Sequence, residues 1–143
     1  MITNERQYAI TKARAERFKQ ALAGSGQQGG KKLHPRALKA MREGIESQLN
    51  DLQEELADYE KLRDGTLSTI VVDSILELAV GLIKARIVRN WTQKELAERL
   101  GLPEQQVQRY EATLYKGVAV ERLQEVADAL KVRVQEVITI ERT

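Results

Sequence analysis

The sequence predicts a mainly α-helical protein in two parts, a long helical hairpin followed by a bundle of short helices. Three observations lead to this fold class. Apolar residues recur at intervals of three and four through residues 38–62, which is the period of one helix face. Residues 92–111, TQKELAERLGLPEQQVQRYE, carry the caps and the turn of two short crossing helices. Two β-branched segments, 67–72 and 134–141, allow a small β-ribbon in addition to the helices.

The first predicted helix covers roughly residues 4–22, with Thr3 as its N-cap. One face of it carries Thr11, Ala15, Phe18 and Leu22. The run Gly-Ser-Gly-Gln-Gln-Gly-Gly at 24–30 is typical of a flexible breaker, so we expect the helix to end before it.

A second, much longer helix is predicted from Pro35 to about Leu62, closed by Gly65. Its apolar stripe consists of Leu38, Met41, Ile45, Leu49, Leu52, Leu56, Tyr59 and Leu62. This coiled-coil-like stripe is longer than the first helix can cover. We therefore expect an antiparallel hairpin whose exposed remainder packs against a second chain. Gly44 interrupts the helix, and we expect another helix to approach closely there.

The segment after Trp91 has the spacing of a helix-turn-helix. Thr92 and Glu95 stand in a capping-box arrangement, and Gly101 is free to take the positive φ at which the helix must end. Pro103 then opens a new helix in which Val107 faces inward. The outward face of that helix is rich in glutamine and arginine. Glutamine pairs bidentately with adenine and arginine with guanine, so this face suits a reader of the DNA major groove.

The remaining elements are helices at residues 75–89 and 120–130, with Ser74 as the cap of the first. Residues 67–72 are interpreted as a short strand. Residues 134–141 either pair with them, which we expect to need a dimer, or form a short last helix at 134–138. The sequence leaves these two alternatives open.

Composition excludes several classes of function. There is no cysteine and a single histidine, His34, so neither a thiolate nor a histidine-cluster metal site can form. No nucleophile–base set and no glycine-rich phosphate loop occurs, so we predict no catalytic residues, no cofactor, no metal and no enzyme. Apolar runs are too short to cross a membrane, and the charged start is unlike a secretory signal, so a cytoplasmic protein is expected.

Charge is distributed unevenly along the chain. Residues 1–42 hold ten Lys/Arg and two Asp/Glu, whereas residues 43–66 hold two and eight. We expect these stretches to face each other within one chain or across a dimer. Residues 82–133 hold ten Lys/Arg and seven Asp/Glu, and this mild positive excess fits attraction to DNA phosphates.

Residues 82–132 resemble the five-helix Xre domain, the fold of lambda-type repressors. The resemblance is carried by LIKAR, TQKELAERLGL, the inward Val107, YE at 110–111 and RLQEVADAL. It implies that the third helix reads bases with Glu104, Gln105, Gln106, Gln108 and Arg109. It implies a phosphate contact at Gln93 and a structural ion pair between Arg86 and Glu111. Thr113, Tyr115 and Lys116 in the following loop are further candidates for phosphate contact.

Three segments follow from this interpretation. Residues 1–66 form a helical hairpin for dimerisation or partner binding, 67–74 a short strand or linker, and 75–143 the DNA-binding domain. The function predicted is a homodimeric, sequence-specific transcriptional regulator that binds double-stranded DNA at a palindromic operator. The alternative is an autorepressing antitoxin that binds a protein toxin, because a helical pair before an Xre domain is similar to the HigA-type layout.

Overall fold

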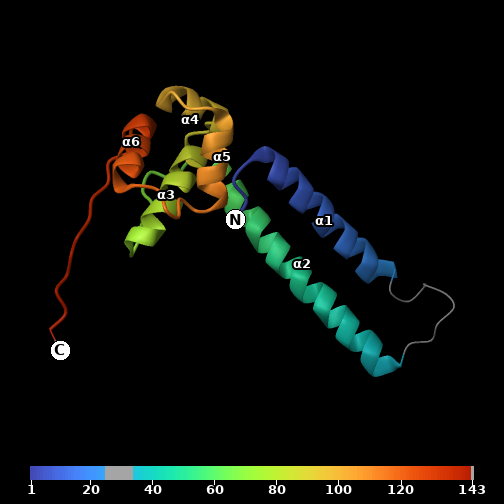
Figure 1. Cartoon of the computed structure of the whole chain (residues 1–143). Coiled ribbons are helices and arrows are strands. Elements are labelled where there is room, and N and C mark those ends of the chain that lie inside the picture. The colour runs from blue at the N-terminus through green and yellow to red at the C-terminus, as the bar shows by residue number, and fades with distance from the viewer. Residues whose placement is uncertain (25–33, 143) are drawn as a thin grey trace. The chain divides into compact units, whose positions relative to one another are not determined.

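The computed structural model describes residues 1–24 and 34–142. Its regular structure in these ranges is helical: α1 (Glu5–Gly24), α2 (Pro35–Arg63), α3 (Ile75–Val88), α4 (Gln93–Leu100), α5 (Glu104–Ala112) and α6 (Val120–Leu130). The mainly helical fold class is thereby confirmed. The chain divides into two compact units, residues 1–64 and residues 65–143 (Figure 1). Most of the predicted glycine-rich breaker lies outside the described residues.

The first unit is a hairpin in which α1 and α2 pack along each other in opposite directions (Figure 1). The cap of α1 is formed one residue later than predicted, because the Asn4 side chain accepts a hydrogen bond from the Gln7 amide at 2.8 Å. The imidazole of His34 caps α2 by accepting from the Arg36 amide at 3.2 Å, and Pro35 occupies the first turn, where its missing N–H costs nothing.

The seam between α1 and α2 is apolar in the middle and polar at one end. Ala15 and Leu49 are buried in it. At the polar end, Tyr8 donates to Glu60 and Tyr59 donates to Glu5, while the two rings lie 5.3 Å apart. These bonds join the start of α1 to the end of α2. They fix the register of the hairpin.

The apolar stripe of α2 is only partly covered. Leu38 and Met41, near the start of this helix, remain exposed because α1 has 20 residues and α2 has 29. Gly44 is also exposed, and no atom lies within 4 Å of the place where its Cβ would stand. Among the described residues of one chain, no other helix approaches Gly44, and an approach by a second chain stays a prediction.

The second unit packs α3 to α6 around a small core. Its fully buried side chains include Ile83, Leu96, Val107, Val126 and Leu130. α4 begins with the predicted capping box of Thr92 and Glu95. It ends at Gly101, whose φ of 68° is the left-handed conformation that turns the chain toward α5.

Two predicted elements differ in the structure. The short last helix, one of the two alternatives at 134–138, is not formed, and within the described residues 67–72 and 134–141 no strand is present either. α6 ends at Leu130, and Lys131 after it takes a left-handed φ of 54°. The β-branched residues that follow at 134–140 are exposed. A ribbon made between two chains stays a prediction.

Candidate nucleic-acid interface

α5 carries the candidate base-reading residues on the face that its core contacts leave free. Val107 on the inner face is fully buried. Glu104, Gln105, Gln108 and Arg109 are exposed, and Gln106 is half-buried. The Gln108 amide donates to the Glu104 carboxylate at 3.4 Å, a surface contact that a competing base edge can replace. The outer face therefore offers amide, guanidinium and carboxylate groups in two successive turns.

The end of α5 is anchored by a buried ion pair between Arg86 on α3 and Glu111. Nε of Arg86 donates to Oε2 of Glu111 at 2.7 Å, and Nη2 donates to Oε1 at 2.7 Å. The two residues are only 2% and 1% exposed. A bidentate pair of this kind constrains direction as well as distance. It holds α5 at a fixed angle to α3.

Two further hydrogen bonds bring α4 into the same network. Nη1 of Arg86 donates to the Trp91 carbonyl at 2.7 Å, and the Gln93 amide donates to Oε1 of Glu111 at 3.0 Å. Gln93 is 5% exposed, so its side chain takes part in the network instead of extending into solvent. The phosphate contact implied for this side chain stays a prediction. Lys94, the next residue of the first turn of α4, is exposed and remains for an anion.

The candidate phosphate residues in the loop after α5 differ in their exposure to solvent. Thr113 and Lys116 are exposed, and the Thr113 hydroxyl donates to the Arg109 carbonyl at 3.0 Å. Tyr115 is instead 4% exposed and stacks on Tyr110 with ring centroids 5.4 Å apart. Burial, and then the Glu111 carboxylate, raise the pKa of the Tyr115 phenol far above its ordinary value. Tyr115 is therefore buried and not exposed in the loop, and its contact with phosphate stays a prediction.

The reason for the burial of Tyr115 is local. Leu114, Tyr115 and Gly117 all take positive φ, between 53° and 74°. The Tyr115 amide donates to the Tyr110 carbonyl at 2.7 Å, which folds the ring back under α5. Left-handed backbone at two successive non-glycine residues is uncommon, and sequence gives little sign of it.

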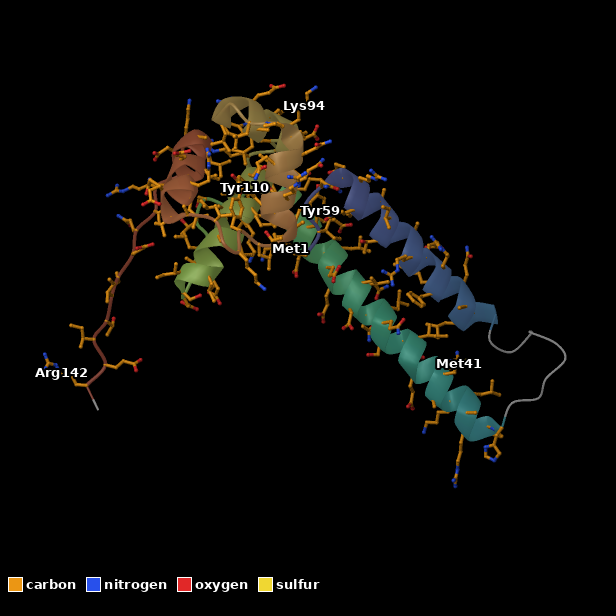
Figure 2. The ribbon with its side chains drawn as sticks, in the orientation of Figure 1. Met1, Met41, Tyr59, Lys94, Tyr110 and Arg142 are labelled. Carbon is orange, nitrogen blue, oxygen red and sulfur yellow. The ribbon has the colours of Figure 1, made fainter. Side chains whose placement is uncertain are left out.

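One surface residue near the site was missed by the sequence analysis. Lys94 follows Gln93 in the first turn of α4, and its exposed side chain points away from the bundle (Figure 2). Its position directly after a capped helix start could have identified it. At the other end of α4, Arg99 stacks on Trp91, with its guanidinium carbon 3.9 Å from the ring centroid.

Comparison with known families agrees with this geometry. A family model described as helix-turn-helix matches residues 82–137, which run from the second half of α3 through α6 to the start of the tail. The second unit contains an Xre-type helix-turn-helix domain. No curated protein and no solved structure matches the chain. In the described ranges, no helix has the length and apolarity needed to cross a membrane.

The Xre-type domain gives the chain a general function, DNA binding of the kind found in transcription regulators. Within the domain, α4 and α5 are the two crossing helices, and the Arg86–Glu111 network lies beneath them. The family match does not cover residues 1–81.

Proposed function

We propose that this protein is a sequence-specific, cytoplasmic regulator of transcription that acts as a homodimer on a palindromic operator. The observation that supports the proposal best is the polar outer face of α5, set on a helix whose end is held by a buried bidentate ion pair. A fixed recognition helix loses little conformational entropy when it binds, so more of its contact energy appears as selectivity.

The residues of this face divide into two roles. Gln105, Gln106 and Arg109 contact base edges, because amide and guanidinium groups match the donor and acceptor pattern of adenine and guanine in the major groove. Glu104 and Gln108 flank them and contribute selectivity at neighbouring bases. Thr113, Lys116 and the start of α4 contact phosphates, which position the domain without reading sequence.

Selection of bound duplexes from a random DNA pool provides the first test, with a palindromic consensus as the expected result. Binding of the selected duplex and of a scrambled duplex is then measured by fluorescence anisotropy at several salt concentrations. Arg109→Ala should lose about 1–3 kcal/mol on the selected duplex only. Lys116→Ala should weaken both duplexes and reduce the slope of log affinity against log salt by about 1.

Arg122→Ala is the matched control. Arg122 lies on α6 in a surface pair with Glu125, so its removal should leave both affinities close to those of the original chain. Equal losses on selected and scrambled DNA for Arg109→Ala would contradict its role as a base reader. Failure to enrich any consensus would contradict sequence-specific binding.

An antitoxin that represses its own operon is the second candidate function. The observation that favours it is the separate N-terminal hairpin, whose Leu38 and Met41 are exposed and available to a protein partner. A neighbouring reading frame that resembles a ribonuclease toxin, and whose product co-purifies with this chain when the two are co-expressed, would support this candidate. Loss of co-purification in a Leu38→Glu, Met41→Glu variant would locate the contact on the hairpin.

A further inference from the structure

The second unit carries two apolar surfaces that no other part of this unit covers. One lies at the entry to α3 and the other in the tail after α6. Their side chains are more than 70% exposed, namely Val71 82%, Ile75 74%, Leu76 80%, Val137 91%, Ile138 89% and Ile140 77%. Clustered apolar exposure of this kind marks a contact surface more often than an ordinary solvated one.

The first surface is an extended segment with one face already packed. Val72 and Ile70 lie against α3, since their γ-carbons stand 3.1 Å and 4.0 Å from the position of a Cβ on Gly81. Val71, between them, points to the opposite side, which is the alternation of a β-strand. Among the described residues, the backbone amides of 67–72 donate no backbone hydrogen bond. The segment is thus a strand-like edge without a neighbour.

The tail is the second surface. Its exit from α6 is fixed, because the Val132 amide donates to the Ala127 carbonyl at 3.1 Å and Arg89 donates to the Lys131 carbonyl at 2.8 Å. From there it runs as an extended chain clear of the helices of its unit (Figure 1). Residues 133–142 donate no backbone hydrogen bond to the described chain either. Apolar residues at 132, 134, 138 and 140 share one side of the extended chain.

We propose that the tail of one copy, residues 134–140, adds as a β-strand to the free edge of residues 67–72 in a second copy. Strand addition supplies hydrogen-bond partners to both backbones and places apolar side chains of the two segments beside one another. The inference does not depend on DNA binding. It concerns a contact between C-terminal units, separate from the hairpin.

Two features of this chain favour a second copy as the partner of this edge. Each copy carries both the edge and the tail, so a two-fold dimer makes the contact twice. The charges also permit it, because residues 67–72 are uncharged and residues 133–142 hold two arginines and two glutamates. Strand addition therefore brings no excess of like charges together. Packing of the edge on α3 supplies the support that an isolated two-stranded ribbon lacks.

The absence of cysteine from the natural chain allows a clean cross-linking test. Full-length Val71→Cys and Ile138→Cys chains, carrying tags of different size, are mixed under mild oxidation and separated on a non-reducing gel. The mixture should form the covalent heterodimer at least about tenfold faster than a control mixture of Val71→Cys with Glu121→Cys. A paired strand holds the two thiols at an effective concentration near millimolar, far above a micromolar solution of protein.

The double variant Val71→Cys, Ile138→Cys distinguishes whether the edge binds the tail of a second copy or the tail of its own chain. Exchange between copies predicts a covalent dimer. A covalently closed monomer would show that each tail folds back on its own edge and would overturn the proposal. The register is covered by testing Val137→Cys and Ile140→Cys in place of Ile138→Cys. If none of the three tail positions reacts faster than the Glu121→Cys control, the proposal is also overturned.

Discussion

The buried charge of the Arg86 guanidinium makes Glu111 the most sensitive single residue of the DNA-binding unit. Removing the carboxylate leaves an unpaired cation in the core, which costs roughly 3–5 kcal/mol in the free energy of unfolding. We expect Glu111→Ala to show this loss in urea denaturation. Replacement of both partners, Arg86→Met with Glu111→Leu, should recover much of it because no uncompensated charge remains.

The surface pair of Arg122 and Glu125 provides the comparison for that prediction. Its atoms are also 2.7 Å apart, but the Glu125 side chain is 57% exposed. Glu125→Ala should therefore change stability by no more than about 1 kcal/mol. A fully stable Glu111→Ala chain would mean that water reaches the Arg86 site.

Tyr115 gives the unit a sensitivity to alkaline pH. Burial, helped by the Glu111 carboxylate, raises the pKa of its phenol in the folded state above the ordinary value of 10.0. The neutral form is then favoured by folding, so its contribution is complete below pH 10 and is lost as the pH rises above that value. Urea denaturation between neutral pH and about pH 11 should show a steeper loss for the original chain than for Tyr115→Phe. Equal slopes would count against burial of the phenol.

The sequence predicted the positions of single side chains less completely than it predicted the helices. The spacing of polar and apolar positions in 104–111 predicted which side chains of α5 face outward, because an α-helix completes one turn in about 3.6 residues. The positions of the Gln93 and Tyr115 side chains depend on contacts with other parts of the fold. Gln93 is drawn inward by a carboxylate 18 positions away, and Tyr115 by two successive left-handed residues. No local pattern encodes either contact.

Two glycines give a prediction at the level of elements. One lies inside a helix, and the other ends a helix in the left-handed conformation. Gly44 lies inside α2 with open space around it, so Gly44→Ala should stabilise that helix by up to about 1 kcal/mol. Gly101 ends α4 with φ +68°, so Gly101→Ala should lose about 1–2 kcal/mol. Thermal unfolding followed by circular dichroism measures both. A loss for Gly44→Ala would indicate a partner helix packed at that position.

Elements with strong local signals were predicted well, and those that depend on partners were not. The capping box and Gly101 marked α4, and the range predicted for α6 matches its observed bounds. The last segment has no such signals. Its β-branched residues fit a strand, yet a strand needs a neighbour, and one chain alone does not provide it.

At the level of the whole molecule, selectivity requires two recognition helices. One α5 contacts only a few base pairs, whereas two-fold pairing would place two of them about 34 Å apart, or a multiple of that, on successive turns of DNA. Two contacts between copies are proposed, one through the uncovered start of α2 and one through the exchanged tail. They lie in different units, so their energies should add.

Four chains test whether both contacts exist: the original, Leu38→Glu with Met41→Glu, a deletion of residues 134–143, and the combination. Each single change should raise the dimer dissociation constant, and the combination should give monomers in light scattering at micromolar concentration. Helix content by circular dichroism should stay close to the original, because Leu38 and Met41 are exposed and residues 134–142 are not helical.

Leu49→Glu serves as the contrasting variant in this set. Leu49 is buried against α1, so a charge there should unfold the hairpin itself and lower helix content. If the Leu38→Glu, Met41→Glu chain dimerises as tightly as the original, the hairpin contact is wrong and the tail must carry the dimer. If the combination still forms a dimer while its helices remain intact, a third surface joins the copies, and the exposed Val120 at the start of α6 is the next position to change.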